Sequence, residues 1–477
     1  MGALARTPRT PVIAVAAAVL VVALLSLILP STATYDPWAW IVWGREAFHG
    51  DLVTDTGPSW KPLPVVVTTL ATPLGSSAPD VWVVVGRAGA LAAPLIAFAL
   101  ARRYGGLIAG LVASLPLALE PWWFRHGWLA NSEGLLVAAV LGAVLAELTG
   151  HRRWALAAGL AAALLRPEAW PFLLLWAAWL AWRAGWGGRL RLAALLAVIP
   201  VAWLVPEKLG SGDFWRAATR AQNPDPGAAA LTSHPALTVL DDYARMLPWP
   251  VWIGLAAAIA LVALRRRGRA DTTAAVDAPA PGEPSPLLAA TAIGGFGLAW
   301  AVLVALMTQA GYSGNSRYLI PAVALLLVAT AIAVGRLWPL LPSPAQWLVG
   351  LALVAVTVGP AIHDIPDDAH KVMVESRLME ALPEAVAAAG GAEFLRRCGP
   401  AYTNRYFVPQ IAWELDEHAR DVGYLDARAP AVLFRPNQFY GWAREPQARS
   451  VAGLRTLVRT RWWQIEVACR PGVEVPR

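Results

Sequence analysis

The chain contains little charge, almost no lysine and only two cysteines. Charged residues make up 15% of its 477 residues and hydrophobic residues 57%, with a mean hydropathy of +0.49. A soluble domain carries roughly 25% charged residues, so the composition excludes a soluble globular protein and places most of the chain in lipid. The net charge of +7 does not indicate nucleic-acid binding, because the basic residues lie at the ends of apolar runs, where they set membrane orientation.

Long apolar runs are abundant, and several reach the roughly 20 residues that a membrane-spanning helix needs. We predict a polytopic α-helical membrane protein with about eleven spans, at 12–30, 80–101, 106–120, 133–149, 153–166, 169–183, 190–206, 249–264, 287–309, 318–335 and 345–362. The first run also fits a signal peptide, since Arg6 and Arg9 precede it and small residues follow it. We interpret it as a retained span because its apolar stretch is longer than a signal peptide requires.

Arginine clusters predict the orientation in the plasma membrane. They occur in alternate connections and fall on one side when the spans alternate: Arg6 and Arg9, Arg102 and Arg103, Arg152 and Arg153, Arg183, Arg189 and Arg191, Arg265 to Arg267 with Arg269, and Arg336. The positive-inside rule makes that side cytoplasmic, with the N-terminus inside and the C-terminus outside. The tryptophans of the outward loops, including Trp38, Trp40, Trp43 and Trp60, are interpreted as an interfacial belt.

Residues 363–477 differ from residues 1–362 because they are charged and have no long apolar run. The patterns predict a helix over 375–389, strands near 401–406, 422–425, 431–434 and 465–468, and a helix over 408–415. This indicates a small extracytoplasmic α/β domain. Both cysteines, Cys398 and Cys469, lie in it, and two thiols in an exported domain favour a disulfide over a metal site.

The residues that could carry chemistry gather near the predicted outer surface. Asp36 follows the first span at the start of the loop 31–79, and a carboxylate there can take the proton of an acceptor hydroxyl. Lys61, one of only three lysines, can bind a lipid phosphate as a compact cation. The alternatives are an Asp-Pro turn that ends a helix and a lysine that extends to lipid headgroups.

Further charged residues lie in the same predicted layer. Arg45 and Glu46 follow Asp36 on a helix that the tryptophan spacing predicts to lie along the interface, either as site residues or as a solvated ion pair. Glu133 opens the fourth span, as a second acid of the site or beside a helix cap. Arg166 and Glu168 charge a tight hairpin between two spans. Arg317 lies at the predicted outer start of another span, where it can bind phosphate.

Together these motifs resemble the GT-C superfamily of polytopic glycosyltransferases, especially the branch of protein O-mannosyltransferases and lipid A aminoarabinose transferases and the mycobacterial polyprenyl-phosphate-dependent transferases. The family pattern is an Asp after the first span, an Arg-Glu-type pair and a Lys-Pro-Pro-Leu step. Asp36, Arg45-Glu46 and Lys61-Pro62-Leu63-Pro64 follow that order, and the resemblance covers residues 12–335. In the family a second acid often follows the Asp, but Pro37 stands there in this chain, so a divalent-ion site is left open. The Lys-Pro-Leu-Pro order also departs from the family's Lys-Pro-Pro-Leu step.

The resemblance implies an inverting transfer of mannose or arabinofuranose from a polyprenyl-phosphate donor to an envelope glycan, lipid or protein at the outer face of the membrane. Asp36 would be the base, Lys61 and Arg317 would bind the donor phosphate, and Glu133, Arg45, Glu46, Arg166 and Glu168 would contact substrate. The C-terminal domain would position the acceptor. The alternatives are a lipid-linked sugar flippase or other transporter, which requires charges at mid-membrane, and a membrane anchor, which needs only one span.

Overall fold

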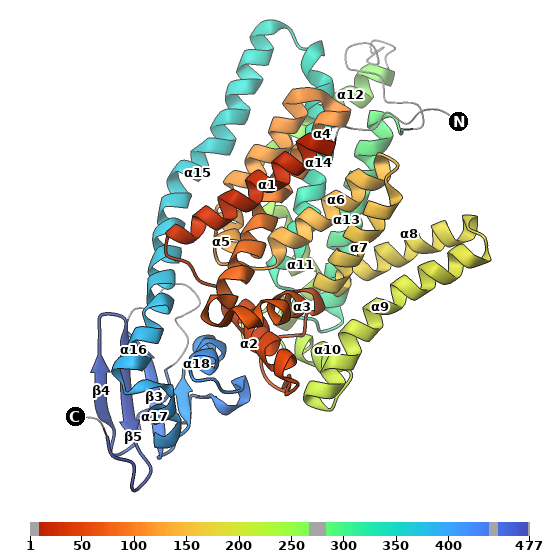
Figure 1. Cartoon of the computed structure of the whole chain (residues 1–477). Coiled ribbons are helices and arrows are strands. Elements are labelled where there is room, and N and C mark those ends of the chain that lie inside the picture. Colours follow the sequence, from red (N-terminus) through yellow and green to blue (C-terminus); the bar gives the residue numbers. More distant parts are fainter. Residues whose placement is uncertain (1–8, 267–282, 438–446, 476–477) are drawn as a thin grey trace.

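The computed structural model describes residues 9–266, 283–437 and 447–475 as a helical bundle with a small α/β domain at one end (Figure 1). Arg6, Arg267 and Arg269 of the predicted orientation pattern lie outside these residues. The membrane-facing part is mostly helical, and the domain at the C-terminal end of the chain contains the sheet.

Each of the eleven apolar runs lies in a helix. The helices are α1 (Arg9–Leu25), α4 (Ala78–Leu119), α6 (Glu133–Leu148), α7 (Arg152–Leu165), α8 (Trp170–Arg183), α9 (Trp186–Ser211), α12 (Trp249–Arg266), α13 (Pro286–Gln309), α14 (Ile320–Leu337) and α15 (Ser343–Glu380). The runs 80–101 and 106–120 both fall in α4, which breaks at Gly106, where φ is 77°. Glycine adopts this left-handed conformation without strain, so the chain reverses there.

The number of membrane crossings is smaller when helix length and apolarity are the criteria. Among the described residues, five helices are long and apolar enough to cross a membrane, or seven if each of two bent pairs counts as one span. The bent pairs are α5 (Pro121–Trp128) with α6, and α11 (Pro235–Met246) with α12. Some predicted spans are therefore helices too short to cross by themselves, and eleven crossings stay a prediction.

Helix α14 forms the centre of the bundle and packs against α4, α12 and α13. It is apolar on all sides, as a helix surrounded by other helices must be, and 94% of its most apolar window is buried. A Cβ atom at Gly335 would lie 2.1 Å from the carbonyl oxygen of Gly105. The absence of a side chain at Gly335 therefore allows α14 and α4 to approach this closely.

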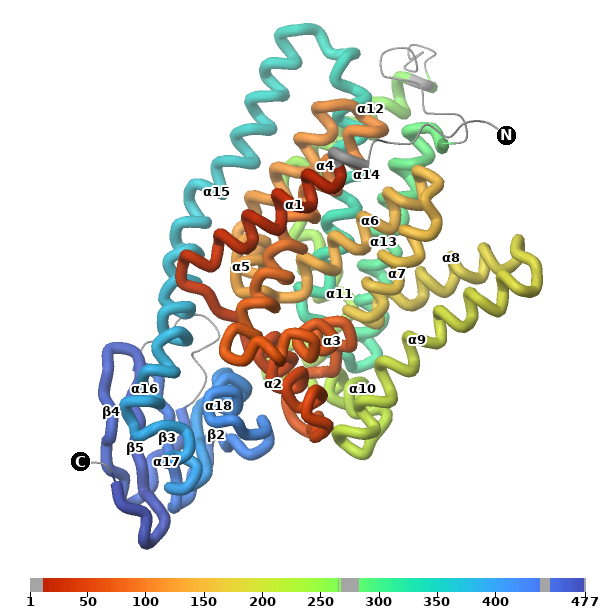
Figure 2. The backbone as a smooth tube through the Cα atoms, viewed as in Figure 1, coloured from red at the N-terminus to blue at the C-terminus, as the bar shows by residue number. Residues whose placement is uncertain are grey.

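Helices α8 and α9 form a hairpin that extends away from the rest of the bundle (Figures 1 and 2). Large apolar side chains cover its outside, and Trp182 is 83% and Trp186 73% exposed. An apolar surface of this size on a protein with long apolar helices indicates contact with lipid. The hairpin thus adds to the membrane-facing surface.

The C-terminal domain contains a five-stranded sheet with the strand order β2-β1-β3-β5-β4. The strands are β1 (Ala401–Thr403), β2 (Gly423–Tyr424), β3 (Ala431–Pro436), β4 (Arg455–Arg459) and β5 (Trp463–Ala468). β1 is parallel to β2 and β3, and β3–β5 and β5–β4 are antiparallel. Four strands match predicted runs, and β4 was not predicted because arginines interrupt its apolar pattern.

Helices α16 (Leu382–Ala388), α17 (Gly391–Cys398) and α18 (Val408–Glu414) accompany the sheet. α18 matches the predicted helix over 408–415. The helix predicted over 375–389 is instead divided, because α15 continues from the bundle to Glu380 before α16 begins. Cys398 and Cys469 form a disulfide that joins the end of α17 to the segment after β5.

The tryptophans of the first loop are core residues, and the interfacial belt predicted for them is wrong. Trp38, Trp40, Trp43 and Trp60 are between 0 and 7% exposed, and they pack in one apolar cluster with Trp82. They lie on α2 (Tyr35–His49) and before α3 (Pro62–Ala71), which pack against each other. Trp249 and Trp252, at the start of α12, are 64 and 44% exposed.

Arg45 and Glu46 attach the C-terminal domain to α2. The Arg45 guanidinium donates to the carbonyl oxygens of Trp413 at 3.2 Å and Glu417 at 2.6 Å, at the end of α18. Glu46 lies 2.8 Å from the His418 ring nitrogen. These two residues therefore hold domains together and are not a solvated ion pair.

Replacing Arg45 by alanine is expected to loosen this contact without unfolding the bundle. A hydrogen bond to a charged group contributes about 1.5–3 kcal/mol, so amide hydrogen exchange in 408–422 should accelerate by about tenfold or more. Hydrogen–deuterium exchange of the detergent-solubilised protein measures this. Asp51→Ala, an exposed residue after the same helix, is the control and should leave the exchange unchanged. Equal exchange in Arg45→Ala and the wild type would contradict the role of Arg45.

Candidate functional site

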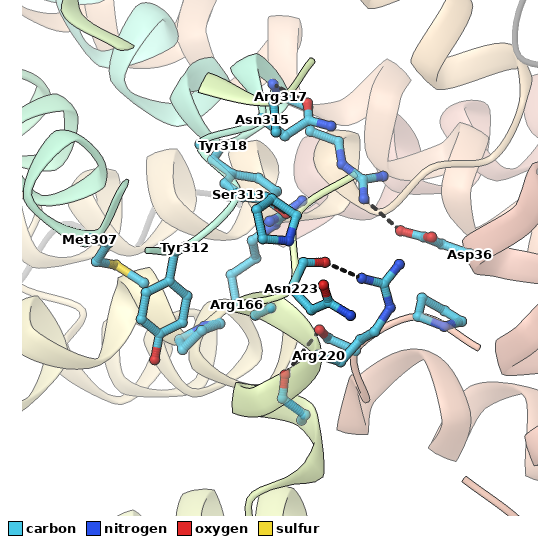
Figure 3. A pocket seen from close by; sticks show the side chains of 18 of the residues that line it. Asp36, Arg166, Arg220, Asn223, Met307, Tyr312, Ser313, Asn315, Arg317 and Tyr318 are labelled. Atoms are coloured by element: carbon cyan, nitrogen blue, oxygen red, sulfur yellow. Dashed lines mark hydrogen bonds and ion pairs between the residues drawn. The ribbon is translucent and has the colours of Figure 1, made fainter. Parts of the chain in front are cut away.

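Asp36 lies in the first turn of α2 and forms an ion pair with Arg317. Pro37 follows it in that turn, where the fixed φ of proline favours the start of a helix. The Asp36-Pro37 step therefore lies at the start of α2 and is not a turn that ends a helix. Arg317 lies in the short helix η5 (Ser316–Leu319), which the Asn315 side chain caps. Arg317 Nη2 is 2.7 Å from Asp36 Oδ2 (Figure 3).

Glu133 joins two guanidinium groups. Its Oε1 atom is 2.6 Å from Arg166 Nη2 and 3.8 Å from Arg317 Nε. Arg166 also lies 3.5 Å from Glu168, and its guanidinium is 4.1 Å from the centre of the Tyr318 ring. The Glu133 side chain is 1% exposed. A buried charge is stable only when it is paired, so Glu133 fixes the positions of both arginines.

Lys61 is the residue before α3, and its side chain is directed toward the start of α6. Its Nζ atom donates to Ser132 Oγ at 2.9 Å and lies 4.7 Å from the centre of the Trp40 ring. Lys61 is 7% exposed, so it does not extend to lipid headgroups. Within the described residues no carboxylate forms an ion pair with Lys61, which leaves its charge available to an anion.

A cavity of about 1100 Å³ brings these side chains together. It is lined by Asp36, Lys61, Arg166, Glu168 and Arg317. Residues far apart in the chain thus share one site, and they come from α2, the segment before α3, the α7–α8 connection and η5. Glu133 lies directly behind the arginines of this wall.

The net charge of the cavity depends on whether Lys61 is protonated. The cluster has three carboxylates, Asp36, Glu133 and Glu168, and three cations, Lys61, Arg166 and Arg317, so the formal charges balance when Lys61 is protonated. Burial and the neighbouring Arg166 lower the pKa of Lys61 to about 7. An anion in the cavity would restore the charged ammonium form.

Asp36 is ionised at neutral pH. Burial alone would raise the pKa of its carboxyl group, but the Arg317 guanidinium and the Lys61 ammonium outweigh burial and hold that pKa below its ordinary value. A carboxylate in this state accepts a proton only weakly. It becomes a stronger base when another anion takes over the contact with Arg317.

The cavity also contains residues that the sequence motifs did not indicate. Arg405, from the C-terminal domain, lies 2.7 Å from Asp225, and Arg220 lies 3.7 Å from the same carboxylate. All three line the cavity with Tyr406, whose hydroxyl group bonds to Glu375 of α15. Arg220 and Asp225 stand in the charged segment 206–248, which the sequence predicts to be an outward loop, and this was the available sequence signal. No sequence signal indicated Arg405, because only the folding of the chain brings the C-terminal domain to this cavity.

Among the predicted site residues, Glu133 lies behind the lining of the cavity, whereas Arg45 and Glu46 belong neither to the lining nor to its charged cluster. They line no part of it and contact α18 and the residues after it instead. Arg45 follows Asp36 by nine residues, about two and a half helical turns, so the two side chains point to opposite sides of α2. This geometry excludes a shared contact with one headgroup.

The acidic residues present do not fit a divalent cation. Among the described residues, no three His, Cys, Asp or Glu side chains form a cluster that could hold a metal ion. Asp36 and Glu133 are both bound to arginines, and Pro37 stands where a second acid would complete a metal-binding pair.

No protein-family model matches the chain, and no curated protein matches it in sequence. Two solved structures of ArnT from Cupriavidus metallidurans resemble it along nearly the whole length. The apo structure is 15% identical, covers 96% of this chain and 98% of that chain, and has a TM-score of 0.55. The structure bound to undecaprenyl phosphate is 17% identical, covers 98% and 100%, and has a TM-score of 0.51. The likeness shows that this chain shares its overall fold with these two structures.

Proposed function

We propose that this protein is an inverting glycosyltransferase that uses a polyprenyl-phosphate sugar as its donor. The observation that carries the proposal is the shared cavity of Asp36, Lys61 and Arg317, in which a carboxylate faces two cations. A base and a phosphate site in one cavity suit a sugar phosphate. The similar structure of ArnT with undecaprenyl phosphate bound supports a lipid-borne phosphate ligand.

In the proposed reaction, Asp36 takes the proton of an acceptor hydroxyl group. At the same time the oxygen of that hydroxyl group attacks the anomeric carbon of the donor sugar. The bond between that carbon and the phosphate oxygen breaks, and its electron pair leaves with the polyprenyl phosphate. The leaving group gains one negative charge, which Lys61 and Arg317 stabilise. A single displacement inverts the anomeric configuration.

Arg317 connects donor binding to the activation of the base. In the free protein its guanidinium is bound to Asp36 at 2.7 Å. A donor phosphate competes for this guanidinium, so the Asp36 carboxylate loses its partner and its pKa rises toward the ordinary value. Glu133 and Arg166 keep Arg317 in place during this exchange. The base thus becomes effective only when the donor is present.

The donor sugar is a mannose or an arabinofuranose, and the acceptor is an envelope glycan, lipid or protein outside the plasma membrane. The sequence resemblance supports these assignments. Arg405 and Tyr406 line the cavity from the C-terminal domain, which supports the role of that domain in positioning the acceptor.

A reconstitution experiment tests the proposal against the transporter alternative. Purified protein in liposomes is given a radiolabelled polyprenyl-phosphate mannose or arabinofuranose, and both transfer to an acceptor extract and movement of the donor across the bilayer are measured. Transfer without flux is the expected result. Flux without transfer for either sugar would overturn the proposal. Lipid profiling of a deletion strain, in which the unused donor should accumulate, then identifies the sugar.

Donor binding should weaken as the pH rises above 7. The pKa of Lys61 is lowered to about 7 in the free protein, and a bound phosphate raises it, because the anion favours the ammonium form. Below pH 7 Lys61 is already charged. Above pH 7 binding requires the uptake of a proton, so the donor Kd should increase by up to about tenfold for each pH unit.

Isothermal titration of the donor between pH 6 and pH 9 measures this dependence. Lys61→Arg should flatten it, because a guanidinium stays charged over this range. Lys208→Arg is the matched control, since Lys208 is exposed and bonds to the Gly212 carbonyl group, and it should keep the wild-type profile. A flat wild-type profile would show that Lys61 does not bind the phosphate.

A further inference from the structure

A second cavity, of about 400 Å³, lies among α7, α8 and α9. It shares no residue with the cavity around Asp36. Three helices each contribute one arginine to its lining: Arg152 from α7, Arg183 from α8 and Arg191 from α9. Leucines of the same helices, including Leu180 and Leu192, line the remainder. We call this cavity the arginine groove.

The arginine groove has an excess of positive charge. Arg152 lies 3.5 Å from Glu147. Among the residues that the structure describes, Arg183 and Arg191 form no ion pair. Two guanidinium charges therefore remain without a carboxylate in a space that is otherwise apolar. Such charges favour an anion that fits between them.

Trp179 holds two of the arginines in position. Its ring lies 4.2 Å from the Arg183 guanidinium carbon and 5.2 Å from that of Arg152. Cation–π contacts of this kind reduce the freedom of the side chains. The guanidinium groups of Arg152 and Arg183 are thus held beside this ring, although both residues are exposed.

The surroundings of the groove are apolar and open to lipid. Leu175, Trp182 and Trp186 on the α8–α9 hairpin are 71, 83 and 73% exposed, and the hairpin extends from the bundle (Figure 2). A ligand that fits the groove therefore combines a negatively charged head with hydrocarbon. A free inorganic anion would leave the leucines of the lining exposed.

We propose that the arginine groove is a binding site for one anionic phospholipid, whose phosphodiester headgroup contacts Arg183 and Arg191. Basic pockets between membrane helices bind such headgroups, and guanidinium groups match phosphate oxygens in geometry. The arginine pattern predicts that this end of the bundle faces the cytoplasm. The site is separate from the donor site and does not depend on the proposed transfer activity.

Native mass spectrometry of the detergent-solubilised full chain tests this proposal. The protein is titrated with phosphatidylglycerol, which is anionic, and with phosphatidylcholine, which has no net charge. The wild type should bind one phosphatidylglycerol in a saturable manner, about tenfold more tightly than phosphatidylcholine. The double variant Arg183→Gln, Arg191→Gln should lose this preference, while Trp179→Leu, with all charges kept, should weaken binding about threefold.

Arg153→Gln is the matched control, because Arg153 is exposed next to Arg152 but does not line the groove. It removes the same charge from the same end of the bundle and should leave the preference unchanged. Equal affinity for both lipids would overturn the proposal, as would an equal loss in Arg153→Gln. Displacement of the phospholipid by millimolar inorganic phosphate would also overturn it and indicate a soluble-anion site.

Discussion

Replacing Asp36 by asparagine is expected to abolish sugar transfer while donor binding is retained. Asparagine has nearly the same shape but cannot accept the proton of the acceptor hydroxyl group, and a positioned base typically contributes about 10²–10⁴-fold to the rate. Asp36→Asn also removes the ion pair with Arg317. The freed guanidinium should bind the donor phosphate as well as in the wild type or more tightly. Single-turnover transfer and donor titration measure the two effects separately.

Asp51→Asn is the control for this substitution, because Asp51 lies in the same segment 31–79, is exposed and does not line the cavity. It should transfer sugar at the wild-type rate. Transfer by Asp36→Asn within a few-fold of the wild type would exclude Asp36 as the base. A parallel loss of donor binding and transfer would instead indicate that Asp36 shapes the phosphate site.

Replacing Glu133 by glutamine is expected to destabilise the protein and to impair donor binding. Glu133 is 1% exposed and is the shared carboxylate partner of Arg166 and Arg317. Removing one partner of a buried ion pair costs about 3–5 kcal/mol, because the other charge stays buried without compensation. The thermal unfolding midpoint in detergent should fall, and the donor Kd should rise because Arg317 is no longer held in place.

Glu384→Gln removes a carboxylate from an exposed position on α16 and should change neither quantity. Combining Glu133→Gln with Arg166→Gln provides a further test. If the loss in Glu133→Gln comes from an uncompensated guanidinium, the double variant should recover part of the stability. An unchanged midpoint in Glu133→Gln would show that the pairing in the cavity contributes little.

Much of the bundle follows from local patterns in the sequence. Every predicted apolar run lies in a helix, because an apolar stretch of this length has to satisfy its backbone hydrogen bonds internally in lipid. Four of the five strands and helix α18 also follow from short-range patterns. The break at Gly106 falls where two predicted runs meet. The burial of the tryptophans of segment 31–79 could not be predicted from the sequence. A tryptophan-rich segment at a membrane surface and a buried one have the same composition.

The placement of Arg45 could have been predicted from helical periodicity, because nine residues separate it from Asp36. The sequence order of the two motifs suggested a shared site, but the rotation of α2 directs Arg45 to the C-terminal domain. Asp36 and Lys61, in contrast, line the same cavity. This outcome depends on the packing of α2 against α3, which no pattern within either helix specifies.

The sequence by itself determined the membrane class, the helical runs, the α/β character of residues 363–477 and the proximity in sequence of Asp36 and Lys61. These features depend on neighbours within a few turns, where periodicity and hydropathy act directly. Only the tertiary structure decided that Arg317 reaches Asp36 across 281 residues, that Glu133 holds two arginines and that Arg405 lines the cavity. Charges pair in a buried site according to their distances in space, and these distances arise when the helices and the domain pack together.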